Sequence, residues 1–242
     1  NGDVQWALID MSLDNGLGQI VGANQQLLQQ TSERLGLTET CDRKGYFIYS
    51  VRGDDEVFNT IVTSPNNTNL LLGQPSCPYT SSFPSSYMGT AKISPNGNFL
   101  IETGLIDLVV GTRFYLVNDL TNDLFFVSNI DKGSYGAEFS PSSEVFFLGE
   151  IGNPGSIGKV NAANIIQQVP FVTQSLNYGG DFQQGKDGKL YTLESQSLGQ
   201  IPDPNNYPNP TYLSGAIPLI SGNNTLKLPT FPSSWFAPER FR

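Results

Sequence analysis

A polar turn between apolar strands recurs at an almost constant interval, and this repeat constrains the fold more than any other feature of the sequence. The copies lie at residues 91–101, 137–147 and 181–191, with a looser one at 43–48. Aligned on Pro95, Pro141 and Lys186, the clear copies are 46 and 45 residues apart, and the looser copy begins 52 residues before Pro95. A near-constant period of this length predicts a repeat architecture.

Each copy has the composition of a β-hairpin. Ser94-Pro95-Asn96-Gly97 suits a tight turn, because Pro fixes φ early in the turn while Asn and Gly tolerate positive φ. Residues 98–102 and 144–148 follow such turns, are rich in aromatic and branched side chains, and are too short for helices. One hairpin cannot bury both its faces, whereas similar units set face to face around an axis can. The repeat therefore predicts the blades of a β-propeller.

The predicted fold class is all-β, a single β-propeller domain with roughly 45-residue, four-stranded blades. Dividing the 242 residues by the period gives about five units. The expected blades are residues 1–37 (partial), 38–87, 88–133, 134–178 and 179–242. Solenoids and β-sandwiches also repeat strands, but a sandwich does not require the same turn in every period. Either the ring is small and closed by its two ends, or it is an incomplete part of a larger ring.

The chain in order gives the expected strands. They lie at residues 4–12, 46–51, 57–63, 99–101, 105–110, 113–117, 124–128, 145–148, 157–160, 165–169 and 190–193. Residues 27–35 form either a strand or an irregular connection. Residues 64–87 are expected to be a long connection, and the Pro-rich residues 201–210 a loop.

The composition excludes some classes of protein. Charged residues make up 14% of the sequence, against about 25% in ordinary globular domains. The net charge of −9 and the lack of any basic run argue against nucleic-acid binding. No stretch approaches the roughly 20 apolar residues of a membrane-spanning helix. The first residues, Asn1 and Gly2, resemble neither a Met start nor a signal peptide, so we expect a mature or trimmed product.

Cysteine and histidine usage limits the chemistry. Cys41 and Cys77 either form one disulfide, in an oxidising compartment, or are two separately buried thiols. With no histidine in the sequence, a Ser-His-Asp triad, a Cys-His pair and an ordinary zinc site are all excluded. We expect no cofactor. Residues 54–56 and 118–123 carry carboxylates of the kind that calcium binds, but they lack EF-hand spacing. This favours solvated turns, with calcium binding as the alternative.

Two short motifs have an alternative explanation as turns. Residues 180–186 match the start of a phosphate-binding loop, but Asp187 replaces the required Ser or Thr and a strand is expected to follow, which indicates a repeat turn. Arg52-Gly53-Asp54 matches a known adhesion motif and lies at an expected hairpin tip, where such a motif would be displayed. Gly-Asp is also a common dipeptide in hairpin turns, so the same residues are explained as a turn. The binding candidates are Arg52 and Asp54 at this tip, and Asp107, Glu138 and Asp181 beside the expected inner strands.

Several motifs in a fixed order resemble a known family. They lie at residues 10–18, 45–48 after Cys41, 88–97, 135–141, 185–191 and 228–231. Together they are similar to the β-propeller regions of large secreted Bacteroidetes surface proteins, the gliding-motility-associated and type IX-secreted proteins. The resemblance implies a bacterial cell-surface location, with further propeller sequence upstream and Ig-like and sorting domains downstream. It transfers no catalytic residues to this protein.

Three functions remain after these exclusions. The first is a secreted, non-enzymatic propeller that mediates binding, adhesion or assembly with a protein or glycan at the cell surface. The second is a carboxylate-dependent propeller enzyme acting on a lactone or glycan, for which acids with perturbed pKa values should converge at the centre. The third is a non-catalytic subunit of a secretion or motility assembly. We expect the first.

Overall fold

The computed structural model contains strands in four antiparallel sheets. It describes residues 2–39, 45–52, 57–63, 75–77, 89–106, 109–117, 124–130, 134–149, 156–160, 166–170, 181–194, 196–219 and 228. Within these residues there are seventeen strands and one short 3-10 turn, η1 (Asp14–Gly16). The described part of the protein has no helix long and apolar enough to cross a lipid bilayer.

The sheets follow one another along the sequence, and within each sheet the strands pair in sequence order. The first sheet is β1 (Gly2–Asp10), β2 (Gln19–Glu39), β3 (Gly45–Arg52), β4 (Val57–Thr63) and β5 (Pro75–Cys77). The second is β6 (Ala91–Ile93), β7 (Phe99–Ile106), β8 (Val109–Val117) and β9 (Leu124–Ile130). The third is β10 (Gly136–Phe139), β11 (Val145–Gly149), β12 (Ser156–Val160) and β13 (Ile166–Pro170). The fourth is β14 (Phe182–Gln184), β15 (Leu190–Leu193), β16 (Ser197–Ile201) and β17 (Leu213–Pro218).

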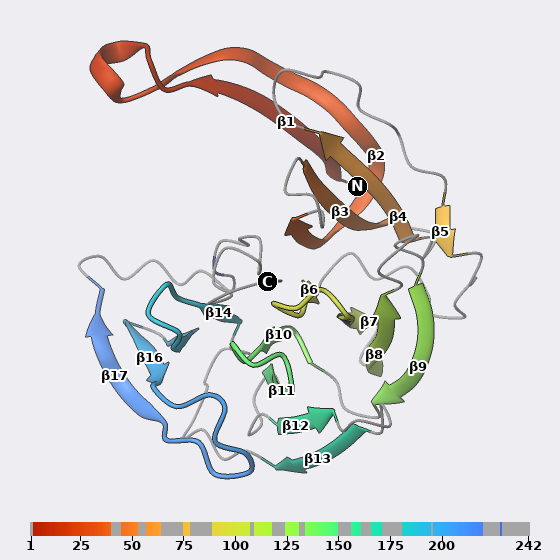
Figure 1. The fold of residues 1–242 in the computed structure, drawn as a ribbon, viewed down its shortest axis with the longest axis vertical. Coiled ribbons are helices and arrows are strands. Elements are labelled where there is room, and N and C mark those ends of the chain that lie inside the picture. The colour runs from red at the N-terminus through yellow and green to blue at the C-terminus, as the bar shows by residue number, and fades with distance from the viewer. Residues whose placement is uncertain are drawn as a thin grey trace.

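The sheets are arranged around a common centre (Figure 1). The short strands β6, β10 and β14 lie nearest the centre, and β9, β13 and β17 lie on the rim. Strand β10 contacts both β6 and β14, and β2 contacts β6, so the inner strands of successive sheets are neighbours. This is the radial arrangement of four-stranded units that the repeat predicts.

The repeat turn has the same geometry in three sheets. Residue Gly97 has φ 79°, Ser143 has φ 66° and Gly188 has φ 75°, all two positions after the aligned residue of the repeat. In each turn the backbone N–H of this residue donates to the carbonyl three residues earlier, at 2.8 to 3.1 Å. In all three sheets a turn with a left-handed residue at this position returns the backbone from the inner strand to its hairpin partner. Of the phosphate-loop-like segment at residues 180–186, Phe182–Gln184 form β14 and residues 185 and 186 begin the repeat turn to β15, as predicted, whereas residue 180 lies outside the described residues.

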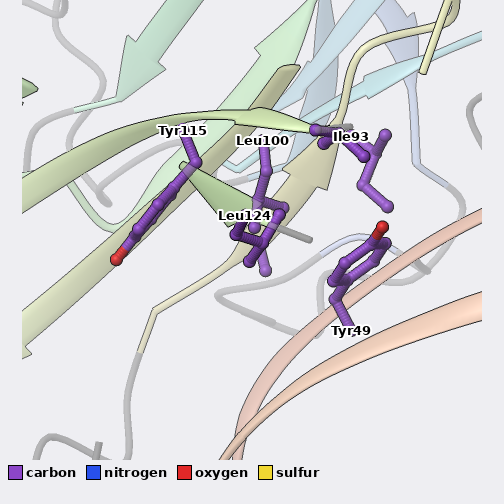
Figure 2. Close-up of a cluster of buried hydrophobic side chains, with 7 residues drawn as sticks. Tyr49, Ile93, Leu100, Tyr115 and Leu124 are labelled. Carbon is purple, nitrogen blue, oxygen red and sulfur yellow. The ribbon is translucent and has the colours of Figure 1, made fainter. Parts of the chain in front are cut away.

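Successive apolar side chains of the inner hairpins point to opposite faces of their sheet, so both faces are buried against the neighbouring sheets. From β11, Phe146 and Leu148 pack with the second sheet, whereas Val145 and Phe147 pack with the fourth. The first sheet joins the ring through Tyr49, which packs with residues of the second sheet, including Ile93, Leu100 and Leu124, as Figure 2 shows. Burial on both faces explains why these strands read as nearly continuous apolar runs.

Three details of the strands differ from those expected or were left open. Strand β2 is continuous over 21 residues, so residues 27–35 belong to a strand, and β1 to β5 form one sheet. Of the predicted strand 105–110, residues 105 and 106 end β7 and residues 109 and 110 begin β8, with Ile106 paired to Val109. Strand β5 lies within the predicted long connection of residues 64–87. The predicted β3–β4 hairpin is confirmed, with Val51 paired to Val57.

Candidate functional site: a polar cluster on the inner strands and a projecting hairpin

Three polar side chains from three sheets meet where the inner strands are neighbours. Lys92 on β6, Glu138 on β10 and Gln183 on β14 each lie three residues before the aligned turn residue of their repeat. The Nζ atom of Lys92 donates to Oε2 of Glu138 at 3.1 Å and to Oε1 of Gln183 at 3.0 Å. All three side chains are buried, with Lys92 and Glu138 only 1% exposed. We call this group the inner polar cluster.

Glu138 is held at both carboxylate oxygens. Its Oε1 accepts the backbone N–H of Phe139 at 3.0 Å, and its Oε2 accepts that of Gln184 at 3.4 Å besides the Lys92 ammonium. Burial raises the pKa of Glu138, and the charge of Asp181 adds to that effect, while Lys92 opposes it. The net pKa of Glu138 lies above the ordinary carboxyl value. In the fold this carboxyl therefore protonates more readily than a free glutamate does.

Asp181 lies immediately before β14 and is also buried. Its Oδ1 accepts the N–H of Phe182 at 3.1 Å, and its Oδ2 accepts the N–H of Leu228 at 2.9 Å. The structure thus brings Glu138 and Asp181 to adjacent inner strands, beside the centre where the sequence had placed them. Asp107, the third predicted acid, lies outside the described residues.

A second buried ion pair, absent from the sequence prediction, links the first two sheets. Arg34 on β2 donates from Nη1 to Oε1 of Glu102 on β7, and the Tyr115 hydroxyl on β8 donates to Oε2 of Glu102 at 3.1 Å. Burial, and then the charge of Glu102, raise the pKa of the Tyr115 phenol. A glutamate within the apolar run of β7 was the signal for this pair. The partner could not be read from the sequence, because Arg34 is 68 residues away.

The outer part of the hairpin of β1 and β2 projects away from the other strands, at the upper left of Figure 1. Its outer part exposes large apolar side chains over a short stretch of sequence. They are Ile9, Met11, Leu13, Leu17, Ile20 and Val21, from 37% to 79% exposed. Exposed apolar side chains gathered in this way mark interaction surfaces in soluble proteins. We call residues 9–21 the apolar hairpin tip.

The other predicted site residues lie mostly outside the described part of the protein. Arg52 ends β3 at the base of the predicted adhesion tip, and Asp54 falls outside the described residues. Cys77 ends β5, but Cys41 is not described, so the disulfide stays a prediction. Among the described residues, no three Cys, Asp or Glu side chains are close enough together to hold a metal ion.

Comparison with solved structures identifies the architecture. A candidate 6-phosphogluconolactonase from Bacteroides fragilis aligns with 88% of this chain and 64% of its own, at 13% identity and a TM-score of 0.63. A candidate 6-phosphogluconolactonase from Bacteroides uniformis aligns with 89% of this chain and 65% of its own, at 13% identity and a TM-score of 0.61. The fold is a β-propeller.

The β-propeller resemblance shows the fold alone, because identities this low imply no activity. A functionally unknown protein from Desulfotomaculum acetoxidans aligns with 89% of this chain and 65% of its own, at 18% identity and a TM-score of 0.55. This protein therefore spans just under two-thirds of the propellers that it matches. No family model and no curated protein matches the sequence.

Proposed function

We propose that this propeller is a non-enzymatic binding or assembly module of a secreted bacterial surface protein, of the Bacteroidetes type that the ordered motifs resemble. Its binding surface is the apolar hairpin tip, and its partner is a protein. The observation that supports the proposal most is the exposure of six large apolar side chains on one projecting hairpin. The low charge content and the acidic balance of the sequence support an extracellular location.

The state of the buried acids also supports a binding role. Glu138 and Glu102 each accept hydrogen bonds from a basic side chain, and Asp181 accepts two backbone N–H groups. These carboxylates are at most 3% exposed. A catalytic acid or base must come within hydrogen-bond reach of its substrate, so the observed arrangement favours a structural role for these groups.

Binding to cells that lack the native protein tests the proposal. Purified wild-type protein should bind saturably to the surface of a deletion strain of the producing bacterium. The double variant Leu17→Ser/Ile20→Ser should bind about a hundredfold more weakly or worse, because burial of each of these apolar residues contributes roughly 1.5–3 kcal/mol. Phe125→Ser is the matched control, since Phe125 is a 54% exposed apolar residue on β9, away from the tip. Equal binding by all three proteins would overturn the proposal.

A carboxylate-dependent enzyme is the second candidate. The observation that favours it is the raised pKa of Glu138 together with the proximity of Asp181. Two candidate lactonases share the fold, which makes lactones the first substrates to try. Lactone hydrolysis that is abolished in Glu138→Gln or Asp181→Asn would establish this function and would contradict the non-enzymatic proposal. The absence of turnover across a panel of sugar lactones would eliminate the lactonase hypothesis.

A further inference from the structure

The turn at the end of the projecting hairpin has an unusual backbone. Asp14, Asn15 and Gly16 have φ values of 51°, 55° and 89°, so three consecutive residues are left-handed. All three are exposed. A methyl group built at Gly16 would meet no atom within 4 Å, so no described residue packs against Gly16 on that side. Asn and Gly are the residues that tolerate this conformation at least cost.

We infer that Asn15 is a site of spontaneous deamidation, in which its side-chain amide is converted to a carboxylate. The backbone nitrogen of Gly16 attacks Cγ of Asn15 and forms a new C–N bond. The bond between Cγ and Nδ2 of Asn15 breaks, and the amide nitrogen leaves as ammonia with the proton lost by the Gly16 nitrogen. Water then opens the resulting succinimide ring at either carbonyl, which yields aspartate or isoaspartate. The reaction needs no reactant other than water.

The local structure leaves both reacting groups accessible. Gly16 has no Cβ to obstruct the approach of its nitrogen to Asn15. No described residue forms a hydrogen bond with the side-chain amide of Asn15, which is exposed to solvent. The Gly16 N–H donates to the carbonyl of Leu13 at 3.2 Å, at the long end of the normal range. Backbone hydrogen bonds from the N–H groups of Gly16, Leu17 and Gly18, at 3.0 to 3.2 Å, hold the turn, but no hydrogen bond between the Asn15 side chain and a described residue has to break before the reaction.

The same dipeptide at Asn96-Gly97 is an internal control. Oδ1 of Asn96 accepts the Ser94 hydroxyl at 2.7 Å and the Asn98 N–H at 3.0 Å. The nucleophile is also engaged, because the Gly97 N–H donates to the carbonyl of Ser94 at 2.8 Å. Breaking two or more such bonds should slow deamidation at Asn96 by about thirtyfold or more relative to Asn15. The third Asn-Gly pair begins at Asn1, which is outside the described residues.

Deamidation would change the apolar hairpin tip. A new carboxylate would join Asp10 and Asp14, between the exposed side chains of Leu13 and Leu17. Isoaspartate also adds a carbon to the backbone, which would change the spacing of the groups that form turn hydrogen bonds such as that from the Leu17 N–H to the Asp14 carbonyl at 3.0 Å. Deamidation at Asn15 does not depend on whether the tip binds a partner.

Timed peptide mapping of the folded wild-type protein at mildly alkaline pH tests the inference. Mass spectrometry follows the amide-to-acid conversion in the peptides that contain Asn15 and Asn96, and an isoaspartate-specific methyltransferase detects the isomer. We expect conversion at Asn15 to be at least about thirtyfold faster than at Asn96, which follows from the hydrogen bonds that hold Asn96.

Two controls keep the result decisive. In urea, where the structure is lost, both sites should convert at similar rates, which shows that the difference arises from the fold. The variant Asn15→Gln should lose the fast conversion and keep the slow one. Equal rates at the two sites in the folded protein would overturn the inference. So would an unreacted Asn15 in the folded protein while the same residue reacts in the unfolded protein.

Discussion

Replacing Lys92 by methionine removes the cation of the inner polar cluster while keeping a side chain of similar length. Among the described residues, Glu138 would then be a buried carboxylate with the N–H groups of Phe139 and Gln184 as its remaining donors. Oε1 of Gln183 would also lose its hydrogen bond from the ammonium group. Breaking a buried ion pair from one side costs about 3–5 kcal/mol, and we expect a loss in this range for the free energy of unfolding at neutral pH.

The pH dependence of this loss provides a second check. The pKa of Glu138 is raised in the fold, so between its unfolded and folded values the native state holds a proton that the unfolded state lacks. Stability from this group is therefore fully present below the unfolded pKa and decreases as the pH rises through the folded pKa. Lys92 lowers the pKa of Glu138, so its removal raises that pKa further. The penalty of Lys92→Met should thus be smaller in mild acid, where Glu138 is protonated.

Urea unfolding at the two pH values measures the effect, with Lys159→Met as the matched control. Lys159 pairs with Glu144 at 3.5 Å between Nζ and Oε2, but the two side chains are 40% and 64% exposed. The control should change the free energy of unfolding by about 0.5 kcal/mol or less. A loss in Lys92→Met no larger than in the control would refute the assignment of the inner polar cluster as a buried, stabilising ion pair. A loss that is the same at both pH values would refute the predicted protonation of Glu138.

Two further substitutions test the packing of the third sheet and the electrostatics of the fourth. Gly158→Ala places a methyl group 2.0 Å from Cζ of the fully buried Phe146, so it should cost about 1–3 kcal/mol or more, seen as a lower Tm. Glu194→Gln should cost about 1–3 kcal/mol at neutral pH, because it weakens the charged acceptor of the Ser197 hydroxyl and of other donors on the fourth sheet. Burial opposes ionisation of Glu194, but the hydrogen bonds, led by that from Ser197, lower its pKa overall, so its contribution should vanish as the pH falls through that lowered value.

The repeat in the sequence was sufficient to predict the radial arrangement, because the turn of each inner hairpin needs residues of a special kind. Gly97 and Gly188 occupy the left-handed turn position, which glycine adopts readily. Ser143 takes the same conformation, although serine does not by itself predict a positive φ. The inner strands could therefore be placed from spacing alone. Their acids, Glu138 and Asp181, were correctly placed beside the centre for the same reason.

Pairings between distant residues could not be predicted in this way. Lys92 occupies the same repeat position as Glu138, so aligning the copies places the two residues on neighbouring inner strands. Their opposite charges then predict the ion pair of the inner polar cluster. Arg34 and Glu102 share no repeat position, and their contact follows only from the packing of β2 against the second sheet. The continuous β2 was missed because its Gln-rich first half has no clear alternation of apolar and polar residues.

Site-specific photo-cross-linking in the producing bacterium tests the proposed binding role most directly. A photoreactive residue at position 17 would lie on the apolar hairpin tip, and one at position 125 would lie on an exposed apolar site of β9. The account predicts a discrete protein adduct at position 17 and none at position 125. Free protein without any adduct at position 17 under the same illumination, or the same adducts at both positions, would contradict it.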